Sequence, residues 1–96
     1  MSAIVDEFVN QLDAKVKGIL RGTAKLVIKD EGSVFLSDTG ATAEDKDADV
    51  TMIATDTVFR NILNGDQNPA MAVMSGKLKV DGNPMRALKV SDILTA

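Results

Sequence analysis

The sequence predicts an α+β domain in which helices pack on one face of a mainly antiparallel sheet. Four stretches alternate apolar and polar side chains with the period of a half-buried strand: residues 23–29, 33–37, 50–55 and 77–81. Four others have the apolar spacing or the start signals of helices: residues 2–20, 56–63, 69–75 and 84–94. Because each strand is apolar mainly on one side, we expect the helices to cover that side and to leave the other side polar.

The length and composition of the chain describe one ordinary globular domain. Ninety-six residues, 45% of them apolar and 26% charged, can bury one hydrophobic core, so we expect a single domain over residues 1–96. No apolar run is long enough to cross a membrane, and the N-terminal stretch has acids where a secretory signal needs basic residues. These features predict a soluble, cytoplasmic protein.

The residue types that are missing exclude several classes of function. The chain has neither histidine nor cysteine, so Ser-His and Cys-His nucleophile–base pairs cannot form and the commonest metal ligand is absent. With no tryptophan or tyrosine and three phenylalanines, it cannot build the aromatic platform on which nucleic-acid bases stack. It also lacks a P-loop and a G-x-G-x-x-G motif. We therefore expect a protein that is not an enzyme, takes no cofactor or metal and binds no nucleic acid.

The first predicted element is an amphipathic helix over residues 2–20, which Gly22 ends. Its apolar positions recur at 3.6-residue spacing, with charged residues elsewhere. This pattern is typical of a helix that covers one face of a sheet. Lys15, Lys17 and Arg21 near its end leave a second interpretation open, which is contact with a membrane surface.

A β-hairpin and an acidic loop are expected next. The alternating runs at 23–29 and 33–37 are joined by a short turn, Asp30-Glu31-Gly32. Residues 38–49 have the composition of a loop. Their acids resemble part of a calcium-binding loop, but Val50 stands at the sixth position, where the sharp turn needs glycine. We interpret this segment as a solvated acidic loop.

Short helices fill the second half of the chain, and each has a start signal. Thr55 or Asp56 can cap the helix that runs to Leu63. Asn68-Pro69 begins a short helix that Gly76 ends. This helix is apolar nearly all round, so at least two of its sides are expected to face something other than water. After the strand at 77–81, Asn83 and Pro84 begin the final helix in the same way.

A signature in this second half resembles that of a known family. It reads SGKLKVDGNPMRALKV, from Ser75 to Val90, and is similar to the GKLK-hydrophobic-x-GN signature of the sterol carrier protein 2 (SCP2) family of lipid-carrier domains. Upstream, an acidic loop, a strand, a short helix and Asn-Gly-Asp-x-Asn-Pro follow one another in an order that also resembles the family. The resemblance implies an SCP2-like fold with an apolar tunnel between sheet and helices.

The same resemblance implies a function. The chain would be a carrier that shields a fatty acyl chain, sterol or related apolar lipid and transfers it to membranes or enzymes. Its partners would be a fatty acid, fatty acyl-CoA, sterol or phospholipid, with transient membrane contact. Apolar residues of the helices and sheet would line the tunnel: Phe8, Leu12, Leu36, Phe59, Ile62, Leu63, Met71, Met74, Met85 and Leu88. The basic residues that would meet the head group are Arg60, Arg86 and Lys89.

Two other hypotheses fit these residues. The chain could be a non-catalytic interaction or accessory module of a lipid- or quinone-metabolising enzyme assembly, as some SCP2-like domains are. It could also keep the fold around a closed core, without a tunnel. Side chains that line a core and a tunnel have the same composition, so the sequence leaves all three hypotheses open.

Overall fold

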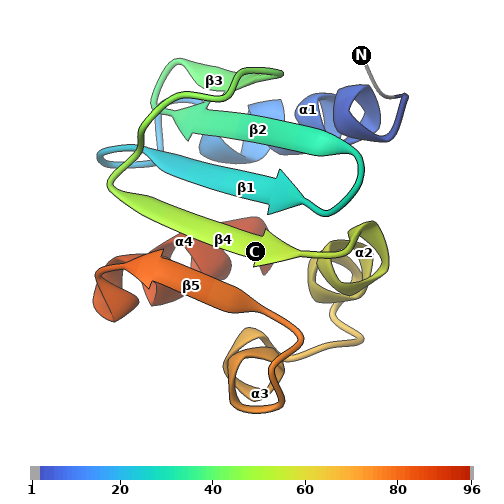
Figure 1. Ribbon diagram of the computed structural model, residues 1–96. Coiled ribbons are helices and arrows are strands. Elements are labelled where there is room, and N and C mark those ends of the chain that lie inside the picture. The colour runs from blue at the N-terminus through green and yellow to red at the C-terminus, as the bar shows by residue number, and fades with distance from the viewer. Residues whose placement is uncertain (1–2, 96) are drawn as a thin grey trace.

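Four helices and five strands make up the described part of the chain. The computed structural model describes residues 3–95. In chain order the elements are α1 (Ala3–Val16), β1 (Ala24–Ile28), β2 (Gly32–Ser37), β3 (Gly40–Thr42), β4 (Val50–Ala54), α2 (Asp56–Asn64), α3 (Pro69–Met74), β5 (Lys79–Gly82) and α4 (Pro84–Thr95). The strands form one sheet; α1 and α4 lie against one face of it, and α3 lies beyond its edge strand β5 (Figure 1). The predicted α+β class is confirmed.

The sheet is mixed, because one of its four pairings is parallel. Its strand order is β3-β2-β1-β4-β5, and every pairing except that of β1 with β4 is antiparallel. The parallel pair arises because residues 43–49 carry the chain from the outer strand β3 across to a place beside β1 (Figure 1). The sheet is therefore mainly antiparallel, as predicted.

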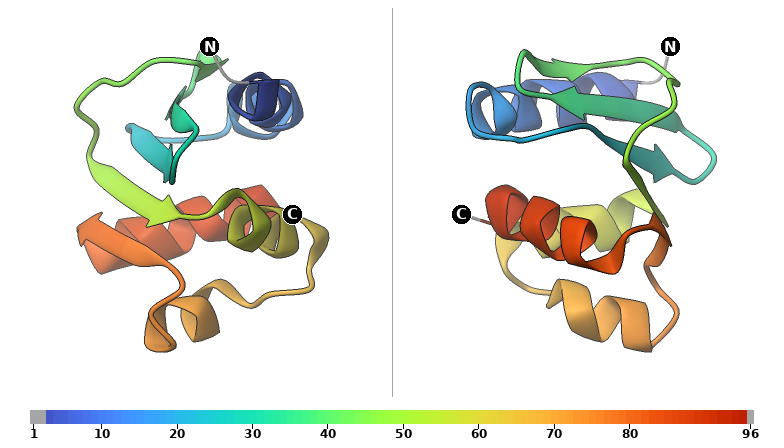
Figure 2. Two further views of the ribbon diagram at one scale, coloured as in Figure 1. Left: turned by 45° about the vertical axis from the view of Figure 1, so that its right-hand side comes forward. Right: turned by 90° about the vertical axis from the view of Figure 1, so that its left-hand side faces the viewer.

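The core fills the space between the sheet and the helices. Alternate strand residues, such as Leu26, Leu36 and Met52, are buried on the side that faces the helices. The rings of Phe8 on α1 and Phe59 on α2 meet edge to face, with centroids 6.3 Å apart. Figure 2 shows α1 beside β2 and β3, and α4 beside β4 and β5. Within residues 3–95, no helix is both long and apolar enough to cross a membrane.

The first helix is shorter than its apolar pattern predicted. The pattern indicated a helix over residues 2–20 that Gly22 ends, but α1 ends at Val16. Gly18 adopts a left-handed conformation, with φ of 73°, and its N–H donates to the carbonyl of Asp38 at 2.7 Å. A tertiary hydrogen bond thus replaces the helical bond that the Gly18 N–H would otherwise donate to Ala14, while Leu20 still packs in the core.

The composition of the acidic segment 38–49 predicted a loop, but only part of the segment is one. Gly40–Thr42 forms the outer strand β3, and the N–H of Ala41 donates to Asp13 of α1 at 2.9 Å. Further along, Asp45 accepts from Lys25 at 2.8 Å, and the ammonium of Lys46 lies 5.3 Å from the Phe35 ring centroid. The segment therefore extends the sheet and then packs over part of its polar face.

The predicted start signals of the later helices are confirmed. Thr55 accepts from the N–H of Val58 at 3.2 Å and caps α2. Asn68 accepts from the first N–H groups of α3, with Pro69 as its first residue. Asn83 accepts from the N–H of Met85 at 2.8 Å at the start of α4. These caps fix where α3 and α4 begin and so position the elements on either side of β5.

Candidate functional site

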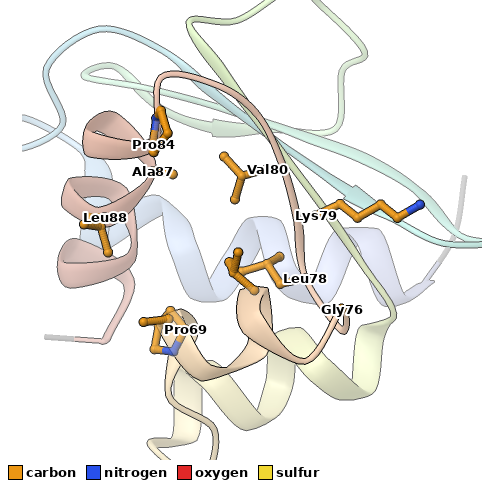
Figure 3. A pocket seen from close by; sticks show the side chains of 10 residues that line it. Pro69, Gly76, Leu78, Lys79, Val80, Pro84, Ala87 and Leu88 are labelled. Carbon is orange, nitrogen blue, oxygen red and sulfur yellow. The ribbon is translucent and has the colours of Figure 1, made fainter.

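An apolar groove opens between α3, β5 and α4. Its volume is about 600 Å³, which is in the range of small-molecule sites. In Figure 3, Leu78 and Val80 face Leu88 of α4 across the space, whereas Lys79 extends away from it. The groove is lined by Pro69, Ala70, Val73, Gly76, Leu78, Lys79, Val80, Pro84, Ala87 and Leu88. This is a site that can hold an apolar ligand by shape and hydrophobicity.

The groove has a buried floor and an exposed rim. Leu78 and Ala87 are 2% and 5% exposed and belong to the hydrophobic core. Val73 and Leu88 are 44% and 47% exposed, so the sides of the groove reach solvent. A ligand in the groove would therefore rest on the core and would cover apolar surface that water now contacts.

The tunnel-lining residues predicted from the sequence fall into three groups. Leu88 lines the groove. Met71, Met74 and Met85 lie exposed on α3 and α4, outside the lining. The other six lie in or against the packed core: Phe8, Leu12, Leu36, Phe59, Ile62 and Leu63. The tunnel between sheet and helices, and the lipid contacts of all ten residues, stay predictions.

The lining residues that the predicted set lacks come mostly from the starts of α3 and α4. Pro69, Ala70, Pro84 and Ala87 line the groove, together with Val73. The two prolines were identified from the sequence only as helix starts, and the alanines are too small to mark a site by residue type. The available signal was the close spacing of α3, β5 and α4 along the chain, which brings these starts together.

Arg60, a predicted head-group residue, is held by acids in this structure. Its guanidinium donates to both carboxylate oxygens of Glu7, at 2.7 and 2.9 Å, and lies 3.7 Å from Asp56. It also lies over the Phe8 ring. The hydrogen bond from Arg60 lowers the pKa of Glu7, and the same bond raises the pKa of Arg60. This arginine ties α2 to α1 at the surface.

The other two head-group candidates, Arg86 and Lys89, line a second cleft of about 300 Å³ between the end of the α1–β1 connection and α4. Arg86 donates to Asp49 at 3.0 Å. Asp49 also accepts from the N–H of Thr23 at 3.0 Å, and its own N–H donates to the Thr23 hydroxyl. The hydrogen bond from the Thr23 N–H lowers the pKa of the Asp49 carboxyl most, and the hydrogen bond from Arg86 lowers it further. The head-group roles of all three basic residues stay predictions.

The lowered pKa of Asp49 gives stability a defined pH dependence. The contribution of this carboxylate is fully present above its unfolded pKa and is lost as the pH falls through its lowered folded pKa. We therefore expect Asp49→Asn to be less stable than the unsubstituted protein at neutral pH, with the difference vanishing in acid. Urea unfolding followed by circular dichroism at both pH values measures it. An unchanged difference at low pH would show that packing, and not charge, is responsible.

Acidic side chains of the described segments do not gather into a metal site. Among residues 3–95, no three His, Cys, Asp or Glu side chains are grouped so that they could hold an ion. Two acids of the acidic segment have other partners: Asp45 accepts a hydrogen bond from Lys25, and Asp49 accepts from Thr23 and Arg86. Their carboxylates join the segment to the sheet and to α4.

The fold and the groove are those of an α+β domain with an apolar site beside its last strand. Residues 5–95 match the model of the SCP-2 sterol transfer family, and the chain belongs to that family. A fatty acid-binding protein of Yarrowia lipolytica (strain CLIB 122 / E 150) is 40% identical over 48 residues, which are 50% of this chain and 37% of that protein. The match thus spans little more than a third of that relative.

Solved structures share the fold over nearly the whole chain. Sterol carrier protein 2 of Yarrowia lipolytica, in its apo form, has a TM-score of 0.73 and 25% identity, covering 95% of this chain and 84% of that one. Sterol carrier protein 2 of Aedes aegypti, in complex with the C16 fatty acid palmitate, has a TM-score of 0.77 and 18% identity, covering 98% and 96%. The predicted family resemblance is confirmed.

Proposed function

We propose that this chain binds one long-chain fatty acyl lipid in the groove between α3, β5 and α4 and delivers it to membranes or enzymes. The observation that carries the proposal is the groove itself, about 600 Å³ of apolar-lined space in an SCP2-family domain. The name of the Yarrowia lipolytica fatty acid-binding protein supports the choice of ligand. The palmitate complex of the Aedes aegypti protein shows that this fold can hold such a ligand.

The expected affinity follows from the apolar area that the acyl chain would bury. A sixteen-carbon chain gains roughly 12 kcal/mol of gross transfer free energy, at about 0.8 kcal/mol for each methylene. Association and ordering cost at least about 4 kcal/mol. At most about 8 kcal/mol remains, which corresponds to a micromolar or weaker dissociation constant.

The groove is expected to select for the acyl chain more than for the head group. Lys79 is the one charged residue of its lining, and that side chain extends away from the space (Figure 3). A pocket of apolar walls discriminates only weakly between chains that differ by one methylene. Fatty acids, fatty acyl-CoA and phospholipids would therefore compete for the site through the chain that they share.

The test is palmitate binding by an exposed wall variant and a matched control. Leu88 lines the groove, whereas Ile19 lies outside it. Their side chains are 47% and 59% exposed, so an aspartate at either position should leave the fold intact. Leu88→Asp places a charge against the bound chain and is expected to weaken binding at least about 10-fold, because that charge would lose water without a partner. Ile19→Asp is expected to bind like the unsubstituted protein. Equilibrium dialysis with radiolabelled palmitate measures both.

Either of two results would contradict the proposal. Equal palmitate affinities of Leu88→Asp and Ile19→Asp would place the acyl chain outside this groove. Absence of palmitate binding by the unsubstituted protein, at concentrations well above micromolar, would remove the carrier function and leave the accessory-module hypothesis.

A further inference from the structure

The short helix α3 buries little of its apolar surface. Of its six residues only Ala72 is buried, while Met71, Val73 and Met74 are 60%, 44% and 83% exposed. Met85 and Leu88 of α4 are exposed as well, at 64% and 47%. We refer to these five residues as the α3–α4 patch. It contains all but one of the large exposed apolar side chains in residues 3–95, and such a concentration marks an interaction surface.

The segment that carries the patch, residues 68–91, has a net charge opposite in sign to that of the rest of the chain. Residues 68–91 carry four basic residues, Lys77, Lys79, Arg86 and Lys89, against one acid, Asp81. This segment has a net charge of +3 in a chain whose net charge is −3, so the remaining residues carry −6. An anionic surface would attract the segment and repel the rest of the molecule, which orients the molecule with the patch toward that surface.

We propose that the α3–α4 patch docks on the surface of an anionic lipid bilayer, with Met71 and Met74 inserted among the head groups and Lys77 and Lys79 beside lipid phosphates. Methionine adapts to irregular apolar surroundings and needs no shaped partner. Exposed lysines near an anionic membrane add affinity as point charges, without a fixed geometry. Both properties suit a fluid bilayer better than a protein surface.

Docking in this orientation would also bring the groove to the membrane. Val73 and Leu88 belong to the patch and to the lining of the groove, so the groove opens on the docked face. An acyl chain could then pass between groove and bilayer with little exposure to water, and this step rests on the proposed function. Docking itself does not, because it requires no ligand in the groove.

The helix α1, for which the sequence left membrane contact open, packs its apolar face against the sheet. Val5, Phe8, Leu12 and Val16 are buried against the sheet. Lys15 donates to the carbonyl of Leu94 at 3.0 Å and so faces α4. Near its end, exposed Ile19 and Lys17 offer a smaller competing surface. That surface provides the control.

The experiment is flotation of lipid-free protein with two kinds of vesicle. One kind contains phosphatidylcholine alone, and the other contains phosphatidylcholine with about a third phosphatidylserine, at low salt. We expect binding to the anionic vesicles at least about 10-fold tighter than to the neutral ones, and we expect it to weaken as sodium chloride is added. Palmitate binding is measured separately on the same preparation.

Three variants locate the docking surface. Met71→Ser with Met74→Ser is expected to weaken binding to anionic vesicles at least about 10-fold, because the inserted apolar side chains are lost. Lys77→Gln with Lys79→Gln is expected to weaken it by a similar factor, on anionic vesicles only. The control, Lys17→Gln with Ile19→Ser, removes one charge and one exposed apolar side chain from the competing surface and is expected to bind unchanged. Thermal melting confirms that each variant is folded.

The outcomes separate this proposal from the proposed function. Palmitate binding without vesicle binding would overturn the docking proposal alone and would leave the patch to a protein partner. Vesicle binding without palmitate binding would support docking and remove the carrier function. A loss of vesicle binding confined to Lys17→Gln with Ile19→Ser would move the docking surface to the end of α1 and would also overturn the proposal.

Discussion

Phe59→Ala is expected to lower the free energy of unfolding by about 3–5 kcal/mol. The Phe59 side chain is 2% exposed and meets Phe8 edge to face where α2 packs against α1. Its removal leaves a cavity that Phe8 and the rest of the packed core can only partly fill. Because a small domain has about 5–15 kcal/mol of stability in total, the variant should lie close to its unfolding transition. Urea unfolding followed by circular dichroism at 25 °C measures the change.

A milder variant on the same helix keeps this prediction measurable if Phe59→Ala does not fold. Ile62 is also 2% exposed, and Ile62→Val is expected to cost about 0.5–1.5 kcal/mol. Leu63 is only half-buried, so Leu63→Ala should cost less than Phe59→Ala. A loss below about 1 kcal/mol for Phe59→Ala would show that the site tolerates a cavity, as a loosely packed tunnel wall would.

The same variants distinguish a packed core from a tunnel. If Phe59 and Ile62 contact only protein, their substitution lowers stability by the same amount with and without saturating palmitate. If they contact the bound acyl chain, their substitution also changes the palmitate affinity. The loss of stability with palmitate then differs from the loss without it by the change in binding free energy. Measuring unfolding in both states therefore tests the lipid contacts that the sequence suggested for residues in this core.

Local signals in the sequence were sufficient to predict where the two helices that border the groove begin. Asn68-Pro69 and Asn83-Pro84 act within a single turn, so their effect does not depend on the rest of the fold. Strand alternation likewise identified the runs that form β1 and β4. The strand β3 gave no such signal, since it has three residues and exists through pairing with β2 and a hydrogen bond from Ala41 to Asp13.

The candidate site could be predicted only in part, because exposure depends on packing and not on residue type. Met52 is 1% exposed and Met74 is 83% exposed, although both stand in apolar stretches. The hydrogen bonds of Arg60 to Glu7 and of Arg86 to Asp49 join residues 53 and 37 positions apart, so neither of these two acids is visible as a partner from local sequence. Sequence reasoning therefore identified a family and a set of apolar residues, while their division into core, groove and exposed patch required the structure.

Gly82→Ala is expected to destabilise the protein by about 1–3 kcal/mol and to disturb the groove from a position outside it. Gly82 has φ of 113° and pairs with Val50 at the end of β5. An added Cβ would stand 2.8 Å from the backbone carbonyl oxygen of Asp49 and 3.2 Å from the Cα of Val50. Since both are backbone atoms of the neighbouring strand segment, the clash can be relieved only if β5 moves away from β4.

A variant at a second glycine distinguishes the effect of the clash from the effect of the positive φ. Gly65 also has a positive φ, 82°, at the end of α2, but an added Cβ there would meet nothing within 4 Å. Gly65→Ala is thus expected to show only the cost of the left-handed conformation, about 1 kcal/mol. The excess loss in Gly82→Ala measures the displacement of β5. Because Val80 of β5 lines the groove, that displacement should also weaken palmitate binding, whereas Gly65→Ala should not. Equal losses of stability in the two variants, with palmitate affinity unchanged in both, would mean that β5 yields without disturbing the groove.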